Sequence, residues 1–308
     1  MPRVEKTKPS SLTFFRKQGN ILNVAITGTT ERQLLTKILA YFKKNRHFKA
    51  KLASKRPLFI TTPNPEQVVI AQTDREYMQI LNGSDVALCD GVGLLTAYEY
   101  KKRVSLLKRP FVVKKIFVFL ESFLYVVKNG RSSDKVLRVI KGRDFFLDLL
   151  KIADEKKYKV FLLGATSAVI NRTFNKLSKR YPSVHFKIFR GANFNDDSVP
   201  LTDKEIKSNK ISLRKINRFA PQMLFVAFGA PKQEKWVYRH IDELKTGLVM
   251  VVGGTFDYIA GTRKSVPSLF GKLGLEWFWR FITGSQNIRR ILNAVIKFPM
   301  LVLSEETD

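Results

Sequence analysis

Short polar side chains follow two apolar runs of this 308-residue sequence, at points where chemistry is feasible. Asp90 comes after the run 86–89 and precedes Gly91, while Thr62 and Asn64 follow the run 58–61. A carboxylate on a glycine turn lets a substrate approach closely and can accept a hydroxyl proton. The alternative is an aspartate that bonds its own turn, with Asn64 capping the next helix. The residue types alone leave both interpretations open.

Further turns of the same kind follow other apolar runs. A helix that begins after the turn 229–231 would offer free N–H groups to a phosphate, and glycines after a strand let the backbone approach a ligand. Each glycine singly is only a turn residue, and each polar residue has a capping role as its alternative. The candidates are Gly164, Gln233, Glu234, Gly253, Gly254 and Asp257.

Strand, tight turn and helix alternate along most of the chain. This alternation is typical of a parallel sheet with helices on both faces, in which ligands bind at the carboxyl ends of the strands. The pattern predicts an α/β fold with a Rossmann-like parallel sheet. The expected strands are 23–26, 58–62, 86–89, 159–163, 185–189, 223–228 and 248–252, and the expected helices include 30–48, 66–72, 167–180 and 232–240.

Several kinds of chemistry lack their motifs. The sequence has no GxxxxGK[ST] loop, no GxGxxG and no GxSxG, and it contains no Asp-x-Asp pair. Its three histidines have no metal-ligand spacing, and Cys89 is the single cysteine. We therefore expect neither a metal nor a cofactor.

The charge is strongly unbalanced, with 55 Lys and Arg against 26 Asp and Glu and a formal net charge of +29. Such an excess favours a polyanionic partner, namely nucleic acid, an anionic membrane or a phosphate-rich substrate. No aromatic RNA-binding pattern and no helix-turn-helix is evident, which disfavours nucleic acid. Residues 1–20 lack the apolar core of about 7–15 residues found in signal peptides, so we expect a flexible basic tail and a cytoplasmic protein.

Two segments are both apolar and basic. In 101–135, polar residues recur every seven positions within a Phe- and Val-rich run, which predicts an amphipathic helix. Such a helix would lie in the lipid interface, or else be a buried helix or an oligomer contact. The second segment, 267–308, is expected to be a C-terminal apolar-basic helical appendage that associates with the membrane. No stretch approaches the roughly 18 uncharged apolar residues of a spanning helix.

Four stretches together resemble the WecG/TagA/CpsF glycosyltransferases. They are TTPNPE at 61–66, CDGVG at 89–93, FGAPKQEKW at 228–236 and GGTFD at 253–257 with Gly261, and a weaker likeness to an R-V-x-G-x-D segment lies at 138–144. The resemblance spans about 21–303. It implies metal-independent, inverting transfer of a sugar from UDP, with N-acetylmannosamine moved to undecaprenyl-diphosphate-linked N-acetylglucosamine in the better-known members. Other members are associated with glucosyl or glucuronyl transfer.

The resemblance also implies roles for particular residues. Asp90 would be the base, with Thr62 assisting it and Asn64 holding the sugar. Gln233 would contact the nucleotide-sugar, Asp257 would lie near the uracil, and Gly164, Gly253 and Gly254 would admit the nucleotide. The tail arginines Arg280, Arg289 and Arg290 would reach the diphosphate and the membrane, and Arg280 and Arg290 match the family's usual spacing. Snorkelling over the apolar tail is the alternative. Asn287 stands where many members have a further Arg.

The expected organisation is a tail over 1–20, an α/β glycosyltransferase domain over 21–266 that carries the insert at about 101–135, and the appendage over 267–308. The expected partners are a UDP-sugar, a lipid-diphosphate-linked acceptor and the anionic inner face of the cell membrane, where the protein would be peripheral. Two other functions remain open at this point. One is a non-catalytic scaffold of a polysaccharide assembly complex, and the other is a nucleic-acid-binding protein.

Overall fold

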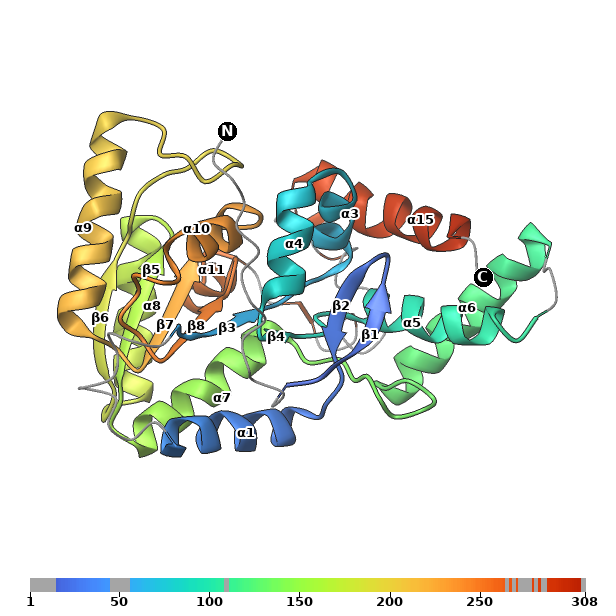
Figure 1. The fold of residues 1–308 in the computed structure, drawn as a ribbon, viewed down its shortest axis with the longest axis horizontal. Coiled ribbons are helices and arrows are strands. Elements are labelled where there is room, and N and C mark those ends of the chain that lie inside the picture. The colour runs from blue at the N-terminus through green and yellow to red at the C-terminus, as the bar shows by residue number, and fades with distance from the viewer. Residues whose placement is uncertain are drawn as a thin grey trace.

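A six-stranded parallel sheet forms the centre of the protein (Figure 1). The computed structural model describes residues 15–44, 56–107, 111–263, 266–267, 270, 279, 282–283 and 287–305. Neighbouring strands follow the order β4–β3–β8–β7–β5–β6, and every pair is parallel. The strands are β3 (Leu58–Thr61), β4 (Val86–Ala87), β5 (Lys159–Gly164), β6 (His185–Phe189), β7 (Met223–Ala227) and β8 (Leu248–Val251).

Helices cover both faces of the sheet because successive strand residues point to opposite sides. In β3, Leu58 and Ile60 pack into one apolar cluster, whereas Phe59 packs into another on the opposite face. The first cluster takes in α1 (Glu31–Lys44), α7 (Gly142–Glu155), α8 (Ser167–Arg180) and α11 (Thr255–Ala260). The second takes in α4 (Arg75–Gly83), α9 (Asp203–Phe219) and α10 (Lys232–His240). The predicted Rossmann-like α/β fold is therefore confirmed.

A second lobe, on the right of Figure 1, packs around its own apolar cluster. It carries an antiparallel hairpin and the helical hairpin of α5 and α6, and the C-terminal helix α15 lies against both α3 and α6. Its elements are β1 (Lys17–Ile21), β2 (Val24–Thr27), α3 (Pro65–Thr73), α5 (Val92–Val104), α6 (Val112–Asn129) and α15 (Phe298–Ser304). Two short helices precede α15, namely α14 (Ile288–Leu292) and a π-helical turn, η1 (Asn293–Lys297).

Two expectations about local structure need correction. Residues 17–20 belong to β1 and not to a tail, because they pair with β2. The strand expected at 23–26 is β2, which lies in that hairpin and outside the parallel sheet. The amphipathic helix predicted within 101–135 is confirmed as α6, and the rest of that segment holds the end of α5 and the loop after α6. Residues 45–48 of the expected first helix lie outside the described residues.

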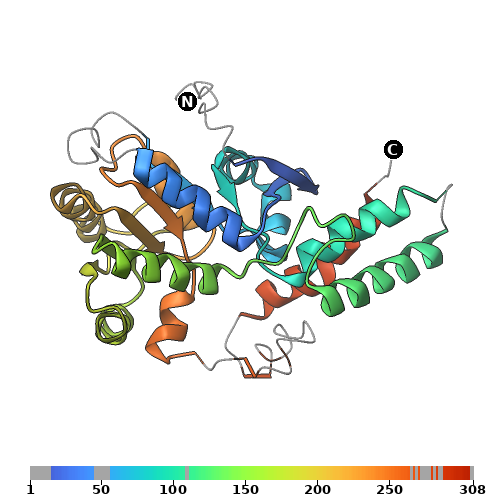
Figure 2. The same ribbon diagram turned by 90° about the horizontal axis from the view of Figure 1, so that it is seen from below.

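Figure 2 shows α6 running alongside α5 at the end of the molecule opposite α9. Among the described residues, no helix combines the length and the apolar character needed to cross a bilayer.

Candidate active site

A cleft of about 1290 Å³ lies at the carboxyl edge of the parallel sheet. This volume exceeds the roughly 300–1,000 Å³ of typical small-ligand pockets, so the cleft has room for two substrates. Most of the candidate residues come together in its lining, although they come from five separate stretches of the chain. They are Thr62, Asn64, Asp90, Gln233, Gly253, Gly254, Asp257 and Arg290.

Asp90 and Thr62 converge because the ends of β3 and β4 are tied together. The Leu88 N–H donates to the Thr61 carbonyl at 2.9 Å, and the Asp90 N–H donates to the Pro63 carbonyl at 3.2 Å. A Cβ atom placed on Gly142 would lie 2.9 Å from Thr62 Cγ2 and 3.4 Å from Asp90 Oδ2. The first turn of α7 therefore packs directly against the Thr62 methyl group and the Asp90 carboxylate, and both residues line the cleft.

Asn64 caps α3 and also faces the cleft. Its Oδ1 accepts a hydrogen bond from the Gln67 N–H at 3.0 Å, and Pro65 occupies the first helical position. This arrangement satisfies an N–H of the first turn and fixes the direction in which the helix leaves β3. The capping role is therefore present, and the remaining amide group of Asn64 is placed to meet a substrate.

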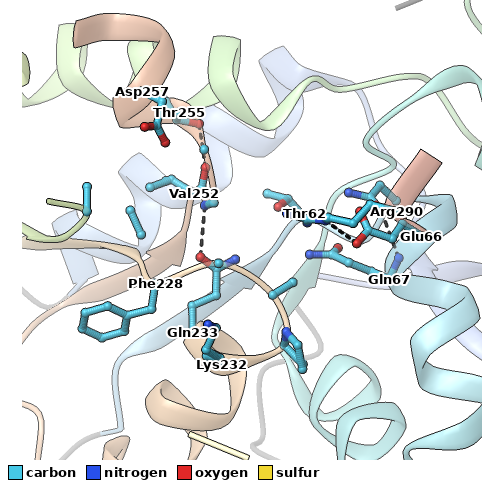
Figure 3. Close-up of a pocket in the computed structure, with 18 of the residues that line it drawn as sticks. Thr62, Glu66, Gln67, Phe228, Lys232, Gln233, Val252, Thr255, Asp257 and Arg290 are labelled. Atoms are coloured by element: carbon cyan, nitrogen blue, oxygen red, sulfur yellow. Dashed lines mark hydrogen bonds and ion pairs between the residues drawn. The ribbon is translucent and has the colours of Figure 1, made fainter. Parts of the chain in front are cut away.

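The side-chain amide of Gln233 connects two walls of the cleft (Figure 3). Its Oε1 accepts from the Gly253 N–H at 3.1 Å, while its Nε2 donates to Glu234 Oε1 at 2.9 Å. Gln67 Nε2 donates to the same carboxylate oxygen at 3.2 Å. Only 1% of Gln233 is exposed. The residue expected to contact the nucleotide-sugar thus uses both ends of its amide within the protein, where it holds α10 against the loop after β8.

Glu234 is the buried centre of this network. Burial raises the pKa of Glu234 to about 7, and the hydrogen bond from Gln233 opposes that effect. The Tyr77 ring is also fully buried. Its burial raises the pKa of its phenol, and the nearby Glu234 charge raises that pKa further. Glu234 lies in the first turn of α10, as expected of an acid at a helix N-terminus, and its carboxylate also accepts the hydrogen bonds from Gln67 and Gln233.

The loop after β8 places Asp257 beside a cation. A Cβ atom on Gly254 would lie 2.8 Å from Arg263 Nη1 and 3.8 Å from Asp257 Oδ2. The Thr262 hydroxyl donates to the Asp257 backbone carbonyl at 3.0 Å. Glycine at position 254 is therefore what allows the Arg263 guanidinium to lie close to the backbone of this loop.

Gly164 lies beneath the cleft and does not line it. Its φ is +112°, and a Cβ atom there would lie 2.6 Å from the Ala227 carbonyl oxygen. The next residue, Ala165, lines the cleft and donates its N–H to that carbonyl at 3.1 Å. The glycine expected to admit a nucleotide instead allows the ends of β5 and β7 to lie close together.

Positive charge surrounds the cleft. Arg290 forms an ion pair with Glu66, Arg190 donates to Glu205 at 2.9 Å, and the Arg143 guanidinium lies 5.5 Å from the centre of the Tyr258 ring. Cations arranged around a cavity favour a ligand that carries phosphate groups. The lining cations are Lys141, Arg143, Arg190, Lys232, Arg263, Arg289 and Arg290, against four acids, Glu66, Asp90, Asp196 and Asp257.

Sequence reasoning missed five of these cations. Lys141 and Arg143 lie within the segment 138–144 that carried the weaker likeness, so a signal for them existed. Lys232 lies within the FGAPKQEKW stretch. Arg190 and Arg263 stand in no recognisable pattern, and only the folded chain places them at the cleft.

The C-terminal segment reaches the cleft through α14. Asn287 caps α14 by accepting the Arg289 N–H at 2.9 Å, so the residue that departs from the family's arginine has a structural role of its own. Arg289 and Arg290 both line the cleft. Arg280 lies outside the described residues. Within those residues, no group of three His, Cys, Asp or Glu side chains is placed to hold a metal ion.

A doubly covered parallel sheet, with a carboxylate, a hydroxyl and several cations in a cleft at its carboxyl edge, has the architecture of an α/β enzyme whose cleft favours a ligand that carries phosphate. The sequence model of the glycosyl transferase WecG/TagA/CpsF family matches residues 19–110 and 118–308. The chain belongs to this family, and it is a hexosyltransferase.

Its curated relatives include proteins of Staphylococcus aureus strains NCTC 8325 / PS 47 and COL. Each is named N-acetylglucosaminyldiphosphoundecaprenol N-acetyl-beta-D-mannosaminyltransferase. Each is 29% identical to this chain over 272 residues, which are 88% of this chain and 87% of the relative.

Proposed function

We propose that the protein transfers N-acetylmannosamine from a UDP-sugar to a lipid-diphosphate-linked N-acetylglucosamine in the synthesis of a cell-surface polymer. The observation that carries this proposal is the convergence of Asp90 and Thr62 in a cleft lined by seven cations. The names of the relatives supply the acceptor and the sugar, and the resemblance of the motifs supplies UDP.

Transfer with inversion is a single displacement at the anomeric carbon of the donor. Asp90 accepts the proton of the acceptor hydroxyl as that oxygen forms the new glycosidic bond. The bond between the anomeric carbon and the β-phosphate oxygen breaks at the same time, and UDP leaves with the bonding electron pair. Negative charge then grows on the departing diphosphate, and the arginines and lysines of the cleft stabilise it.

The cleft provides this stabilisation from side chains and helix ends, and we propose that the reaction needs no metal ion. The first turns of α7 and α10 meet the cleft without a side-chain cap, so their N–H groups add to the positive potential. Asp257 is proposed to accept the ring N–H of uracil, and Gln233 to hold the two walls of the donor site at the correct distance.

The acceptor would be anchored in a bilayer, so the protein is proposed to act at the inner face of the cell membrane. Residues Ile288, Leu292, Ile296 and Met300 recur every four positions along the C-terminal helices and are 45–63% exposed. They form an apolar stripe that starts beside the cleft-lining Arg289 and Arg290. Such a stripe suits insertion into the lipid interface next to the active site.

The test is UDP release by the purified full chain, with EDTA present, using a panel of UDP-sugars and a short-chain lipid-diphosphate-linked N-acetylglucosamine. We expect release that depends on the acceptor and on one sugar, UDP-N-acetylmannosamine. Release only after Mg²⁺ is added would refute metal independence. If the folded protein released no UDP with any of the sugars, the proposed reaction would be refuted.

A further inference from the structure

Helix α6 has two apolar sides, and the structure covers only one of them. On the covered side, Ser122 and Val126 are buried against α5, the Tyr100 and Phe119 rings lie 5.7 Å apart, and the Arg103 guanidinium lies 4.9 Å from the Tyr125 ring centre. The other side faces solvent. Its apolar residues, which we call the α6 face, are Phe111, Val112, Val113, Ile116, Phe117, Leu120 and Leu124, and they are 43–84% exposed.

The α6 face is too continuous to be a scatter of exposed residues. Residues 113, 117, 120 and 124 recur at the spacing of one helix side, and 112 and 116 widen that side by another row. Contiguous exposed apolar patches of this kind mark interaction sites. The match to the family model is interrupted at 111–117, where the face begins, and resumes at 118, so Leu120 and Leu124 lie within the matched residues.

The surroundings of the α6 face are basic. Lys114 and Lys128 are exposed on the helix, Lys115 and Arg131 are partly exposed, and Glu121 is the only acid of the helix. Lys108 and Arg109 precede the helix in the sequence. We call these lysines and arginines the basic rim of the α6 face. A second copy of this chain, with its own charge of +29, would place its positive charges against the basic rim, whereas an anionic lipid surface would attract the rim.

We propose that α6 docks onto an anionic lipid bilayer, with the α6 face in the lipid interface and the lysines among the headgroups. This proposal rests on the proposed function in one respect, since a membrane-anchored acceptor gives the docking its purpose. The helix α15 packs against α6, and the same run of C-terminal helices begins at the cleft-lining Arg290. Because these C-terminal helices connect α6 to the cleft, docking through α6 would hold the cleft near the bilayer surface. The apolar residues involved differ from those of the C-terminal stripe.

The test is flotation of the full chain with vesicles of phosphatidylcholine containing phosphatidylglycerol, compared with phosphatidylcholine alone. The informative variant is Phe117→Glu with Leu124→Glu. Its matched control is Val199→Glu with Ile206→Glu, which adds the same charge at exposed apolar positions outside the second lobe and outside the cleft. We expect the first variant to weaken binding to anionic vesicles at least tenfold and the control to change it less than about twofold.

Three outcomes would overturn the proposal. Equal binding by both variants would show that the α6 face does not meet lipid. Equal binding to the two vesicle types would remove the role of the basic rim. A wild-type dimer that Phe117→Glu with Leu124→Glu converts to a monomer, with vesicle binding retained, would assign the face to a second copy.

The failure of this proposal is distinguishable from failure of the proposed function. UDP release with the short-chain acceptor in solution should be the same for the α6 variant and the wild type, since no residue of the α6 face lines the cleft. Asp90→Asn should float with anionic vesicles as the wild type does. Circular dichroism of each variant confirms that the substitutions leave the fold intact.

Discussion

Helices α7 and α6 both have apolar sides, but the described residues cover the apolar side of α7 and only one of the two apolar sides of α6. On α7, Phe145, Phe146, Leu149 and Leu150 are fully buried beneath the sheet. On α6, Phe117, Leu120 and Leu124 are 51–66% exposed. The apolar periodicity of a helix therefore predicts that a side will be buried, but it does not predict by what. Other described residues cover the apolar side of α7, whereas none of them covers the α6 face.

The cleft lies between these two regions, and its chemistry depends on Asp90. Replacement of Asp90 by Asn keeps the size of the side chain and removes the group that accepts a proton. We expect kcat for UDP release to fall by about 10²–10⁴-fold, the usual range for loss of a general base. The measurement is the initial rate with saturating donor and short-chain acceptor, together with the melting temperature.

Asn64→Ala is the control for this prediction, because Asn64 lines the same wall but carries no acid. It should weaken the cap of α3 and lower stability by about 1 kcal/mol, with a much smaller loss of rate. If Asp90→Asn retained nearly full activity, another group would have to be the base.

The contrast between the two helices can be measured with matched Phe→Ala substitutions. Phe146 is fully buried, and its ring centre lies 4.6 Å from that of Phe225 in an edge-on arrangement. We expect Phe146→Ala to lower the free energy of unfolding by about 3–5 kcal/mol, because it removes apolar contacts and leaves a cavity. Urea denaturation of the purified protein gives this value.

Phe117→Ala is the matched variant on α6, where the side chain is 63% exposed. We expect it to change the free energy of unfolding by less than about 0.5 kcal/mol in the absence of lipid. A large loss of stability in solution would mean that the protein itself covers this side of α6, which would remove the difference between the two helices.

The same contrast explains how far the sequence predicts the fold. The buried strand β5 is a short apolar run that ends at Gly, and it is predicted almost to the residue, as are the edge strand β6 and the helices α8 and α10. The order of the strands was not predictable, since it depends on pairing between segments distant in the chain. The helix α9 was not predicted, and three of its four buried residues, Glu205, Ser208 and Ser212, are polar.

In the candidate site, too, some features are predictable from local motifs and others depend on long-range packing. Local motifs identify Asp90, Thr62 and the loop at 253–257, because polar residues after strands must meet at one edge of a parallel sheet. They do not reveal that both the oxygen and the nitrogen of the Gln233 amide are hydrogen-bonded within the protein, because only folding brings the Gly253 N–H beside it. Long-range packing decides which polar groups remain available to a substrate.

Glu234 belongs to the covered region, and its burial predicts a pH effect. Its pKa rises from 4.5 to about 7 on folding, so the folded chain holds the proton more tightly than the unfolded chain. The stability that this proton contributes is present in full below pH 4.5 and is lost as the pH rises through 7. Glu234→Gln keeps an acceptor oxygen and abolishes this loss.

We expect the free energy of unfolding of Glu234→Gln, relative to the wild type, to rise by on the order of 2 kcal/mol between pH 5.5 and pH 8. Urea denaturation at the two pH values measures it. Glu155→Gln, which removes an exposed carboxylate of α7, is the control. A difference between Glu234→Gln and the wild type that does not change with pH would show that Glu234 is ionised in the folded protein throughout this range.

The smallest expected effect tests how tightly α7 supports the cleft. A methyl group added at Gly142 would lie 2.9 Å from Thr62 Cγ2, so Thr62 must shift, whereas Asp90 Oδ2 would be in ordinary contact at 3.4 Å. We expect Gly142→Ala to lower kcat about tenfold, because Thr62, which is proposed to assist the base, is displaced from its position beside Asp90. Gly83→Ala is the control, since no atom lies within 4 Å of its added methyl group. An unchanged rate for Gly142→Ala would show that this wall of the cleft tolerates displacement, and would weaken the assignment of Asp90 and Thr62 as a unit positioned by α7.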